Sequence, residues 1–440
     1  MNPSDAKDRD LRGDLGWVRR FRSLVARNID PLCRVVENEL GKPPFETLTA
    51  EIIPLLTACR WTEHHAPRLL APKRIRGGGL FQIGQSHQRH RVPMGDVAII
   101  ATWNYPIQLL GVQLVHGLAA GNRVWVKPSE RSPDSQGALL ELAGEAGMGD
   151  ERLRVAPASR EAGQSLLASR TFDHVIFTGS TEVGRTIARD LAGRLTPSTL
   201  ELSGSDSALV LADADPDLAA RSIAFATRLN AGQTCMAPRR VIVDEAILDR
   251  FLGSLRRALS EERATTTPQP DELERSRTAA HAAVESGGRW ISSDPNRAPF
   301  VVLTSDAESP LFLGHHFGPA LAVVPARGRT ELLAWHDLAP RRLATAVFTR
   351  DAGAARRDAP RLGSSVVTIN DCVIPTGHPG VSIGGTGESG WGVSRGEAGL
   401  LAMTRPVCVS RTSRFVRTPT KEPGERVQRS LARWTRRLYG

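Results

Sequence analysis

Short apolar runs alternate with helical patterns through the middle of this chain, and this alternation limits its fold more than any other feature. Residues 97–101 form an apolar run, and apolar side chains then recur at helical spacing from Ile107 to Leu118. The run 123–126, a second helical pattern and the run 174–177 follow. Strands that alternate with helices are typical of βαβ units, whose strands form a mainly parallel sheet. The sequence therefore predicts an α/β fold.

A second alternating block begins near residues 208–211 and extends to residues 366–369. Two such blocks predict two Rossmann-like α/β lobes. Apolar residues at helical spacing predict helices across residues 14–70, and a Gly-rich turn followed by alternating polar and apolar residues predicts a hairpin at about 76–94. Residues 261–276 are polar, and we expect a surface loop there.

The positive charge of the chain is concentrated in its tail. Residues 411–440 contain nine Lys or Arg and two Glu, a charge of +7, which leaves +3 of the total +10 for the first 410 residues. A basic tail on a nearly neutral body argues against a surface built for nucleic acid. The uncharged stretch 97–122 is long enough to cross a bilayer, but its Asn, Gln and His residues favour a buried strand, turn and helix.

The cysteines indicate a reducing compartment. They are Cys33, Cys59, Cys235, Cys372 and Cys408. Their number is odd and no CxxC pair occurs, which fits neither a disulfide framework nor a zinc site, so we expect no metal. Residues 1–10 are polar and charged, unlike a signal peptide. The sequence therefore predicts a cytoplasmic protein.

Three residues are candidates for covalent and acid–base chemistry. Cys235 follows a glycine-bearing turn, where a thiolate would attack a carbonyl carbon; the alternative is a buried, unreactive cysteine. Glu201 lies between Leu200 and Leu202, where desolvation would raise its pKa and make it a general base; alternatively, it faces solvent at a strand end. Asn104, between a strand and a helix, would donate to an oxyanion or satisfy the turn backbone.

Two short motifs are candidates for binding a nucleotide. Gly179 and Ser180 follow a predicted strand and open a predicted helix, whose free N–H groups and dipole favour a phosphate. Lys127 and Glu130 follow another strand, where an ammonium and a carboxylate would hold a ribose. The alternative for either motif is a solvated turn. The glycine spacing matches neither the usual dinucleotide fingerprint nor a P-loop.

Together these motifs resemble those of the aldehyde dehydrogenase superfamily, in family order from about residue 14 to residue 410. The matching segments are W-N-Y-P at 103–106, G-N-R-V-W-V-K-P-S-E at 121–130, F-T-G-S-T-E-V-G at 177–184, L-E-L-S-G at 200–204, G-Q-T-C at 232–235, F-G-P at 317–319 and G-G-T-G-E-S-G at 384–390. The short N-terminus is similar to that of the branch containing fatty and coniferyl aldehyde dehydrogenases.

The resemblance implies NAD(P)-dependent oxidation of a hydrophobic or aromatic aldehyde to a carboxylic acid, with NAD or NADP as cofactor. Cys235 would attack the aldehyde, and the Asn104 amide and the Cys235 backbone N–H would hold the oxyanion of the thiohemiacetal. Glu201 would activate the water that hydrolyses the thioester. The residues that the resemblance places around the cofactor are Trp103, Lys127, Ser129, Glu130, Gly179, Ser180 and Phe317.

The resemblance also implies a division into domains. A cofactor domain would span residues 1–203, with the hairpin at about 76–94 in a small bridging sheet, and a catalytic domain would span residues 204–396. Residues 397–410 would add a strand to the bridging sheet. That sheet would serve oligomerisation and give a homodimer or a dimer of dimers. Residues 411–440 would form a basic tail.

Three positions depart from the family pattern. His315 stands where the family usually has a Glu for the nicotinamide ribose, and an imidazole lacks the two acceptor oxygens of a carboxylate. Ser203 replaces a Gly, so we expect its side chain to crowd the nicotinamide. Residues 381–383 replace a usual Pro-Phe pair in the substrate wall. Two alternatives stay open: an enzyme that passes the thioester to coenzyme A, and a cofactor-poor homologue that acts as a binding or scaffold protein.

The end of the chain predicts a short basic amphipathic helix from Glu425 onwards. The residues on its apolar face would be Val427, Leu431, Trp434 and Leu438. Arginines would lie on its flanks and back. A helix of this kind lies on anionic membranes, so residues 420–440 predict a peripheral membrane contact of a cytoplasmic protein. The alternative is a solvated tail or one that docks on another subunit.

Overall fold

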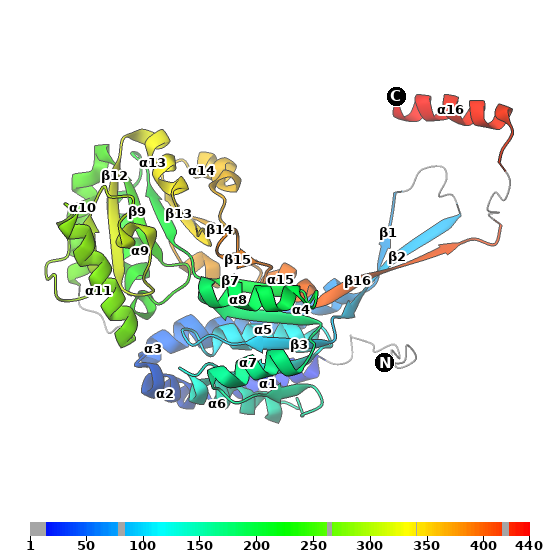
Figure 1. The fold of residues 1–440 in the computed structure, drawn as a ribbon, viewed down its shortest axis with the longest axis horizontal. Coiled ribbons are helices and arrows are strands. Elements are labelled where there is room, and N and C mark those ends of the chain that lie inside the picture. The colour runs from blue at the N-terminus through cyan, green and yellow to red at the C-terminus, as the bar shows by residue number, and fades with distance from the viewer. Residues whose placement is uncertain (1–14, 78–83, 262–265, 340, 416–421) are drawn as a thin grey trace. The chain divides into compact units, whose positions relative to one another are not determined.

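The computed structural model describes residues 15–77, 84–261, 266–339, 341–415 and 422–440 (Figure 1). The chain divides into two compact units. The larger unit comprises Met1–Leu70 and Val92–Arg405, and the smaller comprises Ala71–Arg91 and Pro406–Gly440. The polar start of the chain, predicted not to be a signal peptide, lies outside the described residues.

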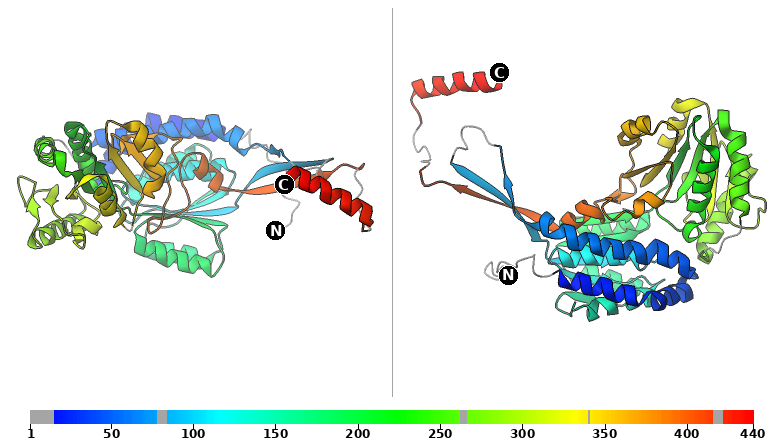
Figure 2. Two further views of the ribbon diagram at one scale, coloured as in Figure 1. Left: turned by 90° about the horizontal axis from the view of Figure 1, so that it is seen from above. Right: turned by 180° about the vertical axis from the view of Figure 1, so that it is seen from behind.

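The larger unit begins with helices, as predicted for residues 14–70 in their described part. They are α1 (Gly16–Arg27), α2 (Ile29–Leu40), α3 (Pro44–Thr47) and α4 (Ile53–Leu70), with a π-helical turn at Leu48–Ile52. Helices α1 and α4 lie side by side, which Figure 2 shows from behind. Their apolar faces bury Trp17, Phe21, Leu55 and Cys59 in one core with β3 and α5, so these helices cover the first sheet.

Six of the described strands form the first sheet, in the order β15-β7-β6-β3-β4-β5. Their bounds are β3 (Asp96–Ile100), β4 (Arg123–Lys127), β5 (Leu153–Val155), β6 (His174–Gly179), β7 (Ser198–Leu202) and β15 (Gly390–Trp391). Neighbours are parallel except β15, which pairs antiparallel with β7. Because β4 and β6 lie on opposite sides of β3, the strand order reverses there, and doubly wound sheets bind ligands at such a point.

The helices that connect these strands are α5 (Gln108–Ala119), α6 (Pro133–Glu145), α7 (Arg160–Ser169) and α8 (Thr181–Ala192). The uncharged stretch 97–122 forms β3 and α5, both buried, so its prediction is confirmed. Among the described helices, none combines the length and the apolar character that a membrane crossing requires.

Seven of the described strands form the second sheet, in the order β10-β11-β12-β9-β8-β13-β14. Their bounds are β8 (Asp206–Val210), β9 (Pro238–Asp244), β10 (Arg289–Trp290), β11 (Phe300–Leu303), β12 (Ala320–Ala326), β13 (Ala344–Phe348) and β14 (Val366–Ile369). The strands are parallel apart from β10. Every residue of β8 and β9 is buried, as expected for a parallel sheet covered on both faces. The α/β prediction is confirmed, and the domain boundaries stay predictions.

The helices of the second half are α9 (Pro216–Arg228), α10 (Leu248–Ser260), α11 (Pro270–Glu285), α12 (Pro310–Leu313), α13 (Gly328–Asp337), α14 (Ala352–Asp358) and α15 (Gly396–Ala402). Short 3-10 turns occur at Leu229–Gly232, Glu245–Ile247, Ala359–Leu362 and Ile374–Gly377.

The surface loop predicted for residues 261–276 is wrong from residue 270 onwards, because α11 begins there. Pro270 stands at the start of this helix, and Asp271 and Glu272 lie in its first turn. Proline and acidic residues favour a helix N-terminus, and these local signals outweigh the polar composition. Residues 262–265 lie outside the described part of the chain.

A three-stranded sheet in the order β1-β2-β16 accounts for the hairpin predicted at about 76–94. Its strands are β1 (Lys73–Ile75), β2 (Gln85–Pro93) and β16 (Thr404–Thr412), and β1 pairs antiparallel with β2. The predicted turn includes Gly78 and Gly79, which lie outside the described residues. The role of this sheet in oligomerisation stays a prediction. Helix α16 (Glu425–Tyr439) confirms the predicted helix in the tail.

Candidate active site

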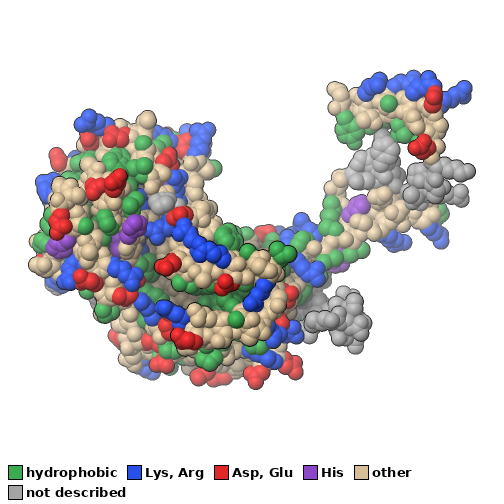
Figure 3. Space-filling model, in the orientation of Figure 1, with side chains coloured by type: hydrophobic (Ala, Val, Ile, Leu, Met, Phe, Trp, Pro, Cys, Tyr) green, Lys and Arg blue, Asp and Glu red, His purple; other side chains and the backbone are tan. Residues whose placement is uncertain are grey.

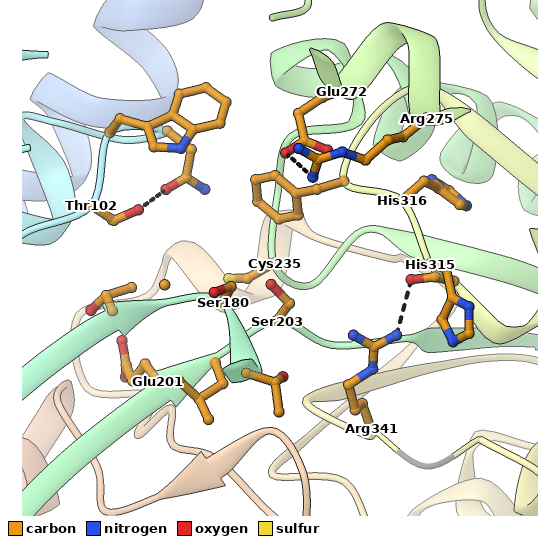
Figure 4. A pocket seen from close by; sticks show the side chains of 18 of the residues that line it. Thr102, Ser180, Glu201, Ser203, Cys235, Glu272, Arg275, His315, His316 and Arg341 are labelled. Atoms are coloured by element: carbon orange, nitrogen blue, oxygen red, sulfur yellow. Dashed lines mark hydrogen bonds and ion pairs between the residues drawn. The ribbon is translucent and has the colours of Figure 1, made fainter. Parts of the chain in front are cut away.

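A pocket of about 270 Å³ lies at the carboxyl ends of the first sheet's strands. Asn104 after β3, Gly179 at the end of β6 and Glu201 near the end of β7 line it. Its other wall comes from the half of the chain that contains the second sheet and includes Cys235 and Phe317. Figure 4 shows side chains from both halves around Cys235. The structure therefore brings together the three residues predicted to perform the chemistry, whose roles stay predictions.

Cys235 is carried by a tightly wound loop that follows α9. Asn230, Ala231 and Gly232 in this loop all have left-handed backbones, with φ of 52°, 51° and 71°. A Cβ at Gly232 would lie 2.6 Å from the carbonyl oxygen of Gly318, so glycine is required there. A left-handed backbone at an alanine is unfavourable by about 1–2 kcal/mol, so the surrounding contacts must hold this loop in place.

Arg239, the second residue of β9, holds this loop with its buried side chain. Its guanidinium donates to three carbonyl oxygens, those of Gly232 (2.8 Å), Thr234 (3.0 Å) and Gly318 (3.0 Å). It also lies over the ring of Phe317, 5.4 Å from the ring centre. Our sequence analysis missed Arg239, and the available signal was the pair Arg239-Arg240 directly before the apolar residues 241–243.

The surroundings of Cys235 disfavour its thiolate form. Burial raises the pKa of the thiol to about 12. The carboxylates of Glu201 and Asp206 raise this pKa further, whereas the charges of Arg395 and Arg239 lower it. The thiolate is the nucleophilic form of cysteine, so the thiol must lose its proton to a base as it attacks. The side chain is only partly buried and lines the pocket, which leaves the sulfur accessible to a substrate.

Glu201 provides a carboxylate on the pocket wall. β15 pairs with β7 so that Gly390 lies opposite Glu201. Burial raises the pKa of Glu201, which is the direction that its leucine neighbours predicted. Two groups oppose this shift: the hydroxyl of Ser394, which donates to Oε1 at 2.5 Å, and the positive charge of Arg395. A carboxylate with a raised pKa is better suited to accept a proton near neutral pH.

Asn104 joins the two walls of the pocket. Its side-chain nitrogen donates to the carbonyl oxygen of Gln233 at 2.9 Å, and its side-chain oxygen accepts from the hydroxyl of Thr102 at 3.1 Å. An amide nitrogen carries two hydrogens, and among the described residues only Gln233 accepts from this one. The second hydrogen is therefore available to an oxyanion in the pocket.

A buried ion pair that the sequence did not indicate supports the Asn104 turn. Lys42 Nζ lies 2.5 Å from Glu51 Oε1 and donates to the Asn104 carbonyl oxygen at 2.9 Å. Glu51 Oε2 accepts from the backbone N–H groups of Ile107 (2.8 Å) and Gln108 (3.3 Å) at the start of α5. Both charged side chains are fully buried, so each depends on the other.

The start of α8 reaches the pocket through Gly179, Ser180 and Thr181. The hydroxyl of Ser180 caps this helix by accepting from the Val183 N–H at 3.4 Å. A Cβ at Gly179 would lie 2.4 Å from the ring of Phe177, which explains the glycine. A helix N-terminus with small residues suits a phosphate, because its free N–H groups point at the anion.

Lys127, Ser129 and Glu130 lie beyond the residues that line this pocket. Lys127 Nζ lies 2.7 Å from Glu130 Oε2. Partial burial raises the pKa of Glu130, but the hydrogen bond from Lys127 opposes this effect, and the net shift is downward. The N–H of Ser129 donates to Gln136 Oε1 at 2.7 Å, and its hydroxyl accepts from the Arg131 N–H at 3.2 Å. Ser129 therefore shapes the turn, and the contact of all three with a cofactor stays a prediction.

Aromatic and polar side chains complete the pocket near Cys235. The rings of Trp103 and Phe317 meet edge to face, with centres 6.1 Å apart and an angle of 80° between their planes. Ser203 also lines this pocket, as Figure 4 shows. His315 lines the pocket, where partial burial and the charge of Arg341 lower its pKa.

Glu272 is a pocket residue that our sequence analysis missed. It lies in the first turn of α11 and is 6% exposed. Its Oε1 lies 3.1 Å from Arg275, whereas its Oε2 is buried and has no hydrogen-bond partner among the described residues. Burial raises the pKa of this carboxyl and Arg275 opposes the shift. The available signal was the Pro-Asp-Glu sequence typical of a helix start.

Known proteins resemble this chain over most of its length. The model of the aldehyde dehydrogenase family matches residues 12–409. A probable coniferyl aldehyde dehydrogenase of Pseudomonas aeruginosa is 30% identical over 91% of this chain and 86% of its own. A dimeric, NADP-preferring aldehyde dehydrogenase of Rattus norvegicus is 28% identical over 90% and 88%. The solved structure of an indole-3-acetaldehyde dehydrogenase complexed with NAD+ aligns with a TM-score of 0.85 at 25% identity, covering 91% of this chain and 84% of that one.

Proposed function

This chain belongs to the aldehyde dehydrogenase family and is an oxidoreductase that acts on aldehydes, and we propose that it oxidises a hydrophobic or aromatic aldehyde to a carboxylic acid through a thioester on Cys235. The observation that carries the proposal is that Cys235, Glu201 and Asn104 line one pocket. A nucleophile, a base and an oxyanion donor are the groups that acyl chemistry requires.

In the first step the sulfur of Cys235 bonds to the aldehyde carbon. The thiol proton passes to water in the pocket, because the raised pKa of Cys235 leaves little thiolate at neutral pH. The free amide hydrogen of Asn104 and the backbone N–H of Cys235 hold the carbonyl oxygen as it becomes negative. A side-chain donor in such a position is typically worth about 3–4 kcal/mol of barrier.

The residues around the pocket fit a dinucleotide. The pocket lies where the strand order reverses, the start of α8 reaches it, and Trp103 and Phe317 form facing walls. When bound, the nicotinamide supplies the acceptor for the hydride that leaves the substrate carbon. The names of the relatives support NAD or NADP. Glu130 favours NAD by repelling a 2′-phosphate, whereas Lys127 beside it would accept one, so both nucleotides are tested.

Hydrolysis of the thioester completes the cycle. Glu201 takes a proton from a water molecule, the hydroxide oxygen bonds to the acyl carbon, and the bond from that carbon to the sulfur breaks. The released Cys235 sulfur takes that proton back from Glu201, and the carboxylic acid leaves. The raised pKa of Glu201 suits this repeated exchange of protons.

The substrate class is supported by the surroundings of Cys235 and by one relative's name. Cys235 packs against a cluster of buried apolar residues that includes Met236, Leu343, Val366 and Ile383. A relative is named for coniferyl aldehyde, which is aromatic. The test is a panel of aromatic, long-chain and short-chain aldehydes with NAD and NADP, read as formation of reduced nucleotide. Cys235→Ala must abolish the reaction, and Cys408→Ala, at an exposed cysteine, must not.

Two other functions make different predictions. An acylating enzyme would pass the thioester to coenzyme A, and Glu201 argues against it because a base that activates water would be wasted. A product assay with and without coenzyme A separates the two. A cofactor-poor scaffold would bind neither NAD nor NADP in a calorimeter, and the presence of Cys235, Glu201 and Asn104 in one pocket argues against it.

We also propose that the chain assembles into a homodimer or a dimer of dimers through the β1-β2-β16 sheet. Edge strands pair readily with strands of another copy. Light scattering of the purified protein would give the mass of one chain if this proposal is wrong. A charge-reversing substitution on the edge strand β16, Arg411→Glu, should shift the mass towards the monomer.

We further propose that the protein is cytoplasmic and that its tail makes a peripheral contact with a membrane. The apolar residues Val427, Leu431, Trp434 and Leu438 of α16 are all exposed, and Figure 3 shows basic side chains on its other side. Such helices bind anionic bilayers. Vesicles with anionic lipid should retain the full chain more than a chain lacking residues 420–440, and equal retention of both would contradict the proposal.

A further inference from the structure

We propose that Arg395 binds a carboxylate group of the substrate, so that the compound oxidised at Cys235 is an aldehyde that also carries an acid group. The inference rests on the proposed oxidation of a hydrophobic or aromatic aldehyde, and it adds an anionic group to that substrate. Arg395 stands directly before α15 and is not one of the residues that line the pocket around Cys235. It also lies outside every segment that resembles the family motifs.

The guanidinium of Arg395 is buried and has no partner within the described part of the chain. The residue is 7% exposed, yet its side chain makes no hydrogen bond, ion pair or aromatic contact with any described residue. An arginine carries five N–H donors and keeps its positive charge at physiological pH. A buried charge without acceptors is unfavourable, so such groups usually have a partner. The side chain is therefore suited to an anion that the protein itself does not supply.

The nitrogens of Arg395 are accessible to a ligand. Arg239 and Arg240 have unpaired nitrogens that are sealed from solvent, but none of the Arg395 nitrogens is sealed in this way. The small exposed fraction of Arg395 therefore includes its guanidinium. Arg239 and Arg240 also donate to carbonyl oxygens of the chain, and these bonds give them a structural role that Arg395 lacks.

Arg395 lies near the two residues that form and hydrolyse the proposed thioester. The residue before it, Ser394, donates its hydroxyl to Glu201 Oε1 at 2.5 Å. Burial raises the pKa values of Glu201 and Cys235, and the charge of Arg395 opposes both shifts, so the guanidinium acts on both groups. Glu201 nevertheless forms no ion pair with Arg395. A substrate whose aldehyde carbon is bonded to Cys235 therefore has a free cation close to it.

Residues 381–383 connect Arg395 to the substrate side of Cys235. The apolar side chains of this segment pack with Cys235 in one cluster. The N–H of Ser394 donates to a carbonyl oxygen of the segment at 3.2 Å, and a Cβ at Gly396 would lie 3.0 Å from a side-chain oxygen of the segment. The residues on both sides of Arg395 therefore contact the part of the chain that the family resemblance places in the substrate wall.

A carboxylate fits this guanidinium better than a neutral acceptor does. The planar fork of an arginine donates two parallel hydrogen bonds to a carboxylate, and the pair also cancels the buried charge. A neutral acceptor would leave the charge uncompensated. The other titratable group near Arg395 is His116 in α5, and burial lowers its pKa to about 4, so it supplies no negative charge. The acid group must therefore come from the substrate.

Matched aldehydes that differ by one charge test the inference. 4-Formylbenzoate and its methyl ester share the ring and the aldehyde, and only the first carries a carboxylate. The wild type should oxidise the acid with a kcat/KM about tenfold or more above that of the ester, and Arg395→Met should lower this ratio about tenfold. The ratio is the readout because the charge of Arg395 also acts on Glu201 and Cys235, and that effect is common to both aldehydes.

A second pair and two further variants complete the experiment. 6-Oxohexanoate and hexanal repeat the comparison with a flexible chain, which does not fix the spacing between aldehyde and acid, and a preference for the acid in either pair supports the inference. Arg395→Lys keeps the charge without the planar fork and should retain part of the preference. Arg60→Met, at an exposed arginine of α4, should retain all of it. The thermal transition of each variant shows that it is folded.

Two results would overturn the inference while the proposed function stands. The first is an equal kcat/KM for the acid and the neutral aldehyde in both pairs, which the wild type alone can show. The second is a preference for the acid that Arg395→Met retains, because equal losses with both aldehydes would mean that Arg395 acts only on Cys235 and Glu201. A wild-type protein that oxidises no aldehyde of the panel would instead overturn the proposed function itself.

Discussion

The side-chain nitrogen of Asn104 donates to the carbonyl oxygen of Gln233 at 2.9 Å, across the boundary between the turn after β3 and the loop that carries Cys235. This bond fixes the oxyanion donor relative to the nucleophile, although the two are far apart in the sequence. A rigid placement matters because the donor is effective only when it is already in position before charge develops.

Asn104→Ala should lower kcat by about 10²–10³, the loss typical of one oxyanion donor. KM should change little, because the donor acts mainly in the transition state. Steady-state kinetics with one aldehyde measure both constants. Thr102→Val, which removes only the bond to Asn104 Oδ1, serves as the control and should lose far less. A kcat within threefold of the wild type would contradict the role of Asn104.

The free enzyme should react with iodoacetamide about tenfold faster at Cys235 for each pH unit between pH 7 and 9.5. The pKa of this thiol is raised to about 12, so the thiolate fraction is small and rises with pH throughout this range. Alkylation rates, followed by mass spectrometry of the Cys235 peptide, measure the dependence. A plateau in the rate below pH 9 would show a thiol with a lower pKa.

Lys42→Met should lower the free energy of unfolding by about 3–5 kcal/mol, because it leaves the buried Glu51 without its partner. Urea unfolding measures the loss. Lys73→Met, at an exposed lysine, is the matched control and should have little effect. Equal losses for the two variants would show that the ion pair does not support the Asn104 turn.

Ser203→Gly should tighten the binding of NAD+ several-fold if the serine side chain crowds the nicotinamide. Ser203 lines the same pocket as Cys235. Calorimetry measures the affinity, and Ser203→Ala, which keeps the Cβ, distinguishes the Cβ from the hydroxyl. Weaker binding by Ser203→Gly would mean that the hydroxyl helps to hold the cofactor.

Local patterns in the sequence predict the parts of the fold and site that local physics determines. Apolar runs that alternate with apolar residues at helical spacing predict both α/β lobes, because the spacing of buried side chains distinguishes strands from helices. Cys235, Glu201 and Asn104 each stand next to a strand end or a glycine turn, where parallel strands present their carboxyl ends to one pocket.

Contacts between distant residues explain what the sequence did not predict. Arg239 holds the Cys235 loop, and Lys42 pairs with Glu51 beneath Asn104, but nothing near these residues indicates their partners. Glu272 was missed for a different reason, because the polar composition of residues 261–276 concealed a helix start. Its place in the pocket wall depends on the packing of α11 against Gly318.

The most direct test of the proposed chemistry is the intact mass of Glu201→Gln after one turnover with an aldehyde and NAD+ or NADP+. This variant cannot activate water, so the account predicts reduced nucleotide together with an acyl group retained on Cys235, seen as a mass increase that the Glu201→Gln, Cys235→Ala double variant lacks. Reduced nucleotide without an adduct on Cys235, or no reduced nucleotide with any aldehyde of the panel, would contradict it.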